Sequence, residues 1–173
     1  MSSSKDNSVK YTVMFVCTGN ICRSPMALGI LDKLLPVSIR DSVLITSSGT
    51  SAYPGSPASR HAVEVCRTFG ADISGHKSKP TDGKLVAEVD LILVMEPHHL
   101  DYIGGLDLTA FERSFLLKEY KRSTNYLGPR SVSDPIGGDR AVYQAVFEDI
   151  HGEIRRILPD IERTVNERKR PDQ

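Results

Sequence analysis

The chain has 173 residues, of which 39% are hydrophobic and 25% are charged, and these values suit one compact domain. Lys plus Arg and Asp plus Glu both total 22, so no strong global field attracts nucleic acid or an anionic membrane, and we expect neither as a partner. The sequence shows no bilayer-spanning stretch, no apolar signal-peptide core and no disulfide framework among its three cysteines, so we expect a cytoplasmic location.

Predicted secondary structure begins with a short apolar run at residues 13–16, which is typical of a buried strand. Apolar residues then recur at helical spacing over residues 25–35, and we expect Ser24 to cap this helix and Pro25 to take its first position. Later segments alternate in the same way. The expected later strands are residues 43–45, 89–95 and 115–117, and the expected later helices are residues 57–69, a short one opening at Pro97 and a long one over residues 142–161.

This alternation predicts an α/β fold of three layers, in which a parallel sheet is covered by helices on both faces. Residues 11–166 form the expected single domain, between a disordered tail at residues 1–10 and a frayed tail at residues 167–173. We expect the domain to be a monomer or a weak dimer. In such sheets ligands bind beyond the carboxyl ends of the strands, where the segment after residue 16 lies.

That segment reads Cys17-Thr18-Gly19-Asn20-Ile21-Cys22-Arg23-Ser24-Pro25. Backbone N–H groups that lead into a helix form an anion-binding nest, and Arg23 can grip two phosphate oxygens. We expect Gly19 to adopt backbone angles that a β-carbon forbids, and Asn20 to take the left-handed region. Cys17 would be a thiolate, hydrogen-bonded by Ser24 and able to attack phosphorus. The alternative for Cys17 is a buried structural cysteine before a turn.

The other two cysteines have less definite roles. Cys22 leaves two alternatives open, either a protective disulfide with Cys17 under oxidation or a small residue packed behind the loop. Cys66 lies on the apolar side of a predicted helix, where we expect it to fill the core.

The leaving group of a phosphate ester needs a proton, so a carboxylic acid must face Cys17 across the phosphorus. We select Asp134, which Pro135 helps to hold on an ordered loop, although a plain turn aspartate fits the sequence equally well. Asp139 is the competing residue, but it precedes a helical pattern and is expected to be an N-cap.

With these motifs, the chain resembles the low-molecular-weight protein tyrosine phosphatases from about residue 11 to residue 158. The resemblance is carried by residues 16–25, Ser47-Ser48-Gly49-Thr50 and Asp134-Pro135. It implies hydrolysis of phosphorylated proteins without metal or organic cofactor, on a four-stranded parallel sheet of flavodoxin-like order. It assigns a phosphocysteine intermediate to Cys17, phosphate binding to Arg23 and acid–base catalysis to Asp134. The implied phosphate-binding loop comprises Thr18, Gly19, Asn20, Ile21, Cys22 and Ser24, and a supporting network joins Asn20 and Ser24 to Ser47 and His76.

Two positions in the sequence indicate different substrate classes. Tyrosine-specific members commonly carry an aromatic residue after Asp-Pro, whereas this chain has Ile136 in an Asp-Pro-x-Gly-Gly pattern that it shares with members resembling protein-arginine phosphatases. Those arginine phosphatases carry Thr where this chain has Ile21. The Ile21 side chain suits an aromatic ring better than a guanidinium. We therefore favour phosphotyrosine over phosphoarginine. Tyr53 is either the aromatic wall of the site or a plain loop tyrosine.

Three other functions fit the sequence less well. A thiol-linked arsenate reductase shares the fold and loop, but it needs further relay cysteines, and residues 71–117 contain none. A non-catalytic phosphate-binding module is disfavoured because nucleophile, arginine and acid are all present. A zinc site would combine Cys17 and Cys22 with His98 and His99, but adjacent histidines are poor partners on one site. We expect both histidines on a solvated helix start.

Overall fold

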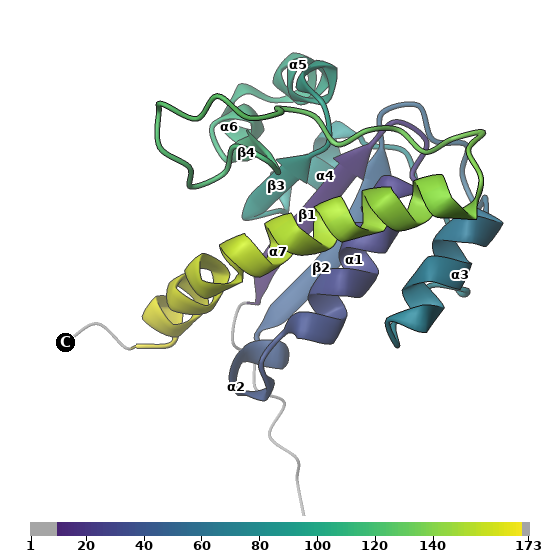
Figure 1. Cartoon of the computed structure of the whole chain (residues 1–173). Helices are drawn as coiled ribbons and strands as arrows, with labels where there is room; N and C mark the ends of the chain where they lie inside the picture. Colours follow the sequence, from purple (N-terminus) through teal and green to yellow (C-terminus); the bar gives the residue numbers. More distant parts are fainter. Residues whose placement is uncertain (1–9, 171–173) are drawn as a thin grey trace, which may run out of the picture.

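The computed structural model describes residues 10–170, in which strands and helices alternate along the chain (Figure 1). The elements are β1 (Tyr11–Cys17), α1 (Arg23–Leu34), α2 (Val37–Arg40), β2 (Val43–Gly49), α3 (Arg60–Thr68), α4 (Gly83–Ala87), β3 (Leu91–Val94), α5 (Pro97–Leu106), α6 (Leu108–Phe111), β4 (Ser114–Leu116) and α7 (Arg140–Lys169). Within residues 10–170, no helix is long and apolar enough to cross a membrane.

The four strands form one parallel sheet in the order β2-β1-β3-β4, which confirms the expected flavodoxin-like order. The register pairs Cys17 at the end of β1 with Gly49 at the end of β2, and Val16 with Val94 at the end of β3. The carboxyl ends of the three strands therefore meet at one edge. The loops that leave this edge carry the candidate site.

Alternation along β1 divides the core into two layers. Val13 and Phe15 pack among buried residues of α1, α3 and α7, whereas Met14 and Val16 pack among buried residues of α4, α5 and α6. Figure 1 shows the long helix α7 lying with α1 over one face of the sheet and α5 beyond the other face. The expected three-layer arrangement is confirmed.

The structure departs from the expected boundaries mainly where a short or polar segment gives little signal. β1 and β2 both continue past their expected ends, to Cys17 and Gly49. In β2 the additional residues Ser47 and Ser48 are polar but buried, so an apolar pattern does not reveal them. The short helices α2, α4 and α6 have four or five residues each, too few for a helical period to be recognised. Pro97 opens α5 as predicted.

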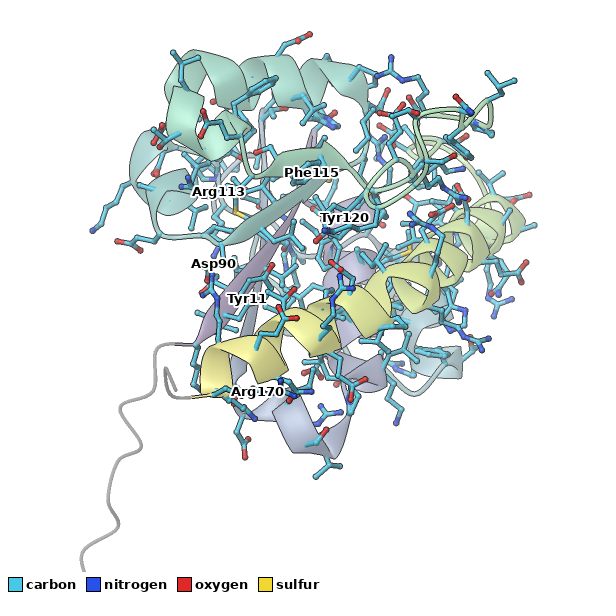
Figure 2. All side chains as sticks on the ribbon, turned by 90° about the vertical axis from the view of Figure 1, so that its left-hand side faces the viewer. Tyr11, Asp90, Arg113, Phe115, Tyr120 and Arg170 are labelled. Carbon is cyan, nitrogen blue, oxygen red and sulfur yellow. The ribbon has the colours of Figure 1, made fainter. Side chains whose placement is uncertain are left out.

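The C-terminal end of α7 also differs from expectation. Residues 167–169 are helical rather than frayed, since Arg168 pairs with Asp90 at 2.9 Å and Lys169 donates to the Ser38 carbonyl. The Arg168 guanidinium also lies over the ring of Tyr11. Figure 2 shows Tyr11 and Asp90 beside this end of α7. The tails expected at residues 1–9 and 171–173 lie outside the described residues.

Candidate active site

The loop between β1 and α1 wraps around the thiol of Cys17, which is 2% exposed. The Cys17 Sγ accepts a hydrogen bond from the Asn20 backbone N–H at 3.3 Å and lies 3.0 Å from the Ser24 hydroxyl. Asn20 has a φ of 55°, so the predicted left-handed conformation is confirmed. Two hydrogen-bonding groups of the loop therefore face the buried sulfur.

Two expectations for this loop are wrong. Gly19 does not have a positive φ, and a Cβ added there would only touch Ile21 at 3.5 Å, so no forbidden backbone angle explains this glycine. Helix α1 begins at Arg23 with Cys22 as N-cap, which puts Ser24 and Pro25 at its second and third positions. Ser24 does not cap the helix because its buried hydroxyl contacts Cys17 and Asn20 instead.

The Asn20 side chain joins the loop to β2 and to the segment before α4. Its Nδ2 donates to the hydroxyls of Ser24 and Ser47, both at 2.9 Å. Its Oδ1 accepts from the backbone N–H of Lys79, also at 2.9 Å. These bonds satisfy a fully buried amide and fix the left-handed turn, so Asn20, Ser24 and Ser47 meet as the resemblance implied.

His76 completes this support from outside the sheet. Its Nε2 lies 2.7 Å from the backbone carbonyl oxygen of Asn20. Burial lowers the His76 pKa, the Asn20 carbonyl opposes that shift, and the charge of Lys79 adds to it. A neutral ring with its proton on Nε2 can donate to the carbonyl, which holds the loop without adding a charge beside it.

Arg23 is 1% exposed and is held by three acceptors from distant segments. One terminal nitrogen donates to Glu96 and, at 2.9 Å, to the Val132 carbonyl oxygen. The other donates to Asp134 Oδ2 at 2.9 Å. The guanidinium is thus fixed in orientation beside the loop, as a bidentate anion ligand requires.

The two candidate acids have different surroundings. Asp134 has a 39% exposed side chain that contacts Arg23 and accepts from the Ile136 backbone N–H at 3.1 Å. Asp139 is the N-cap of α7, where its Oδ1 accepts from the Val142 N–H, and this confirms its expected role. Of the two, Asp134 lies at the loop.

A cavity of about 190 Å³ opens at this point. It is lined by Cys17, Thr18, Gly19, Ile21, Cys22, Arg23, Asp134 and Ile136. Ile21 and Ile136 give it aliphatic walls, and the 60% exposed side chain of Ile136 forms part of its rim. Tyr53 is 81% exposed and is not among the residues that line the cavity, so its role as an aromatic wall stays a prediction.

All three cysteines are free thiols. Cys22 lies 3.2 Å from the Tyr143 hydroxyl and donates to the Ser59 hydroxyl, and burial raises its pKa. Cys22 therefore packs behind the loop in this reduced protein. A disulfide with Cys17 under oxidation stays a prediction. Cys66 is fully buried in the core, which confirms its expected role, and burial raises its pKa to about 12.

The sequence did not single out Glu96, and the expectation that His99 lies on a solvated helix start is wrong. His99 is fully buried rather than solvated, because its ring fills the space between α5 and the loop, while His98 is exposed as expected. Both ring nitrogens of His99 have hydrogen-bond partners, so it is a poor candidate for the zinc site. The available sequence signal was a Glu directly before Pro97 and a His two residues after it, at the start of a helix that follows a buried strand.

Comparison with known proteins gives one family. The family of low molecular weight phosphotyrosine protein phosphatases matches residues 12–169. The probable low molecular weight protein-tyrosine-phosphatase EpsP of Ralstonia nicotianae is 47% identical over 87% of this chain and 95% of its own. A putative low molecular weight protein-tyrosine-phosphatase of Klebsiella pneumoniae is 36% identical, covering 79% of this chain and 88% of its own.

A solved structure gives the same result for the fold. The arginine phosphatase YwlE of Geobacillus stearothermophilus superposes with a TM-score of 0.80 and 31% identity. The match covers 94% of this chain and 99% of that protein. Together with the loop that runs from Cys17 to Arg23, these matches show that the chain belongs to the low molecular weight phosphotyrosine protein phosphatase family.

Proposed function

We propose that this protein hydrolyses phosphotyrosine in proteins through a covalent phosphocysteine on Cys17. The observation that carries the proposal is the convergence of three groups on one cavity: the Cys17 thiol, the Arg23 guanidinium and the Asp134 carboxyl. A nucleophile, a cation for the phosphate oxygens and a proton donor are the groups that this reaction needs.

In the first step the Cys17 thiolate attacks phosphorus. An S–P bond forms while the bond from phosphorus to the ester oxygen breaks, and Arg23 with the loop N–H groups stabilises the charge on the phosphoryl oxygens. The hydrogen bonds from the Asn20 N–H and the Ser24 hydroxyl favour the thiolate before attack. The same bonds make the sulfur a better leaving group later.

Asp134 acts twice in this scheme. Its carboxylic acid gives a proton to the departing oxygen, and the resulting carboxylate takes a proton from the water that attacks the phosphocysteine. That second step releases inorganic phosphate and restores the thiolate. The Ile136 N–H bond to Asp134 Oδ1 supports this role, because it fixes the carboxyl at the mouth of the cavity.

Phosphotyrosine is the substrate that the cavity walls favour. Ile21 and Ile136 offer apolar surface to a ring. Neither side chain can form a hydrogen bond with a guanidinium. Phosphoarginine is the second candidate, since the chain is also similar to proteins named as arginine phosphatases. Residues 134–138 are the part of the site that favours this alternative.

The test compares kcat/KM for a phosphotyrosine peptide and a phosphoarginine peptide of the same sequence, without added metal. We expect at least a tenfold preference for phosphotyrosine, and we expect Ile21→Thr to reduce it. A preference for phosphoarginine would instead assign specificity to residues 134–138. The Cys17→Ser variant should bind inorganic phosphate without turnover, and steady-state hydrolysis by it would remove Cys17 as the nucleophile.

A further inference from the structure

His99 connects two parts of the site that are far apart in the sequence. Its Nε2 lies 3.0 Å from the Thr18 hydroxyl, and its Nδ1 accepts from the backbone N–H of Glu96 at 3.1 Å. Thr18 is the residue after Cys17 and lines the cavity, while Glu96 is an ion-pair partner of Arg23. One buried ring therefore contacts both the loop that holds the sulfur and the backbone of Glu96, whose carboxylate holds the guanidinium.

The hydrogen bonds fix the protonation state of this ring. A backbone N–H can only donate, so Nδ1 must carry a lone pair and the proton must lie on Nε2. The Nε2–H then donates to the Thr18 hydroxyl. Burial, with the charges of His98 and Arg23, lowers the His99 pKa to about 3, while Asp134 opposes the shift. The ring stays neutral and keeps this direction at working pH.

Thr18 is held from two opposite sides. Its carbonyl oxygen accepts from the Ser51 N–H at 2.9 Å, which ties the loop backbone to the segment after β2. On the other side, His99 is the hydrogen-bond partner of its side chain. The two contacts leave the peptide after Cys17 little freedom, so the loop N–H groups point in fixed directions.

We propose that His99 is a positioning residue, which orients the phosphate loop through Thr18 and the Arg23 clamp through Glu96. The inference rests on the proposed function, since the loop and the clamp matter as the site that binds and transfers phosphate. His99 does not touch the reacting atoms. It acts by fixing the loop N–H groups and the Arg23 guanidinium in the relative orientation that phosphate binding requires, before the substrate arrives.

Two substitutions separate positioning from helix capping. In His99→Asn the amide oxygen can still accept from the Glu96 N–H, but the side chain is too short to reach Thr18. His99→Gln can accept from the same N–H and is long enough to donate to Thr18 as well. We expect kcat/KM to fall about tenfold or more in the Asn variant, with most of the loss recovered in the Gln variant, as one hydrogen bond of about 1.4 kcal/mol predicts.

Phosphate affinity supplies a second readout that does not depend on turnover. In the Cys17→Ser background we expect His99→Asn to weaken binding of inorganic phosphate, measured by calorimetry, while His99→Gln changes it little. Thr18→Val should have the same effect alone and should add little to His99→Asn, because both substitutions remove the same hydrogen bond between Thr18 and His99. His151→Gln is the matched control, since His151 lies on α7 and packs against Phe69 and Phe147 rather than against the loop; it should match the parent.

The outcomes distinguish the two proposals. Unchanged activity and phosphate affinity in His99→Asn would overturn the positioning role, as would equal losses in the Asn and Gln variants that follow their melting temperatures. A wild-type protein that hydrolyses neither phosphopeptide would overturn the proposed function. A fall in phosphate affinity confined to His99→Asn would still support the role of His99 in that case.

Discussion

The α-carbon of Gly49 lies so close to Thr18 that a Cβ added at Gly49 would stand 2.5 Å from the Thr18 carbonyl oxygen. The same Cβ would stand 2.8 Å from the backbone nitrogen of Asn20. Both atoms belong to the backbone of the candidate phosphate loop, which cannot rotate away as a side chain would. The loop therefore packs directly against the end of β2, and only a residue without a side chain fits at position 49.

Gly49→Ala should consequently damage the site more than the fold. We expect kcat/KM to fall by about 100-fold, because a shift of about 1 Å in the loop misplaces the groups that hold phosphate. The control is Gly152→Ala, in which the new Cβ meets nothing and the helix α7 gains about 1 kcal/mol of stability. Full activity in Gly49→Ala would mean that the loop relaxes without cost.

The parts of the fold that the sequence predicted are those with strong local patterns. Buried apolar runs located the four strands, and the long stripe that includes Ile150, Ile154 and Ile161 located α7. The sheet order came from the family resemblance, because residues such as Val16 pair with β2 and β3 across long stretches of chain. Local patterning carries no direct signal for such pairing.

The candidate site was predictable where it is contiguous in the sequence. Residues 17–24 were found together, whereas Glu96, His99 and the Val132 carbonyl reach Arg23 or Thr18 only through tertiary packing. Tyr53 lies on a loop that leaves its side chain exposed, so its contact with the substrate stays a prediction.

Asp134→Asn should reveal the proton donor through its dependence on the leaving group. Asparagine can keep the hydrogen bond from the Ile136 N–H but cannot give a proton, so esters with poor leaving groups should slow by 10²–10⁴-fold, a range of about the usual size for acid catalysis. Aryl esters with good leaving groups should slow much less. A series of substituted phenyl phosphates measures the difference.

The control for that series is Asp139→Asn. Asn is as good an N-cap as Asp, so α7 keeps the bond to the Val142 N–H and the rates should match the wild type. Equal losses in both substrate classes for Asp134→Asn would point to a structural role of Asp134. A leaving-group effect in Asp139→Asn would transfer the acid role to that residue.

Oxidation should distinguish the two roles left open for Cys22. We predict that peroxide inactivates the protein and that a thiol restores activity, since a sulfenic acid on Cys17 can condense with the Cys22 thiol and release water. The bonds of Cys22 to Ser59 and Tyr143 must break first. Recovery should fall in Cys22→Ser but not in Cys66→Ser, whose thiol is buried in the core. Equal recovery in all three proteins would leave Cys22 as a packing residue.

Stability should depend on pH through His99. Its folded pKa of about 3 lies below its usual value near 6.5, so between these values the unfolded state binds more protons than the folded state. The free energy of unfolding is therefore unaffected by this group above pH 6.5 and falls as the pH drops below it. The expected contribution is roughly 1 kcal/mol for each pH unit between pH 6 and pH 4.

Urea unfolding of the wild type and His99→Gln at several pH values isolates this term. His76 and His151 also have lowered pKa values, but they are present in both proteins, so their contributions cancel in the difference. We expect the wild type to lose stability more steeply than His99→Gln below pH 6.5, because glutamine does not titrate. Parallel curves would show that His99 is not protonated on unfolding over this range, and would remove the buried neutral ring as the cause of acid sensitivity.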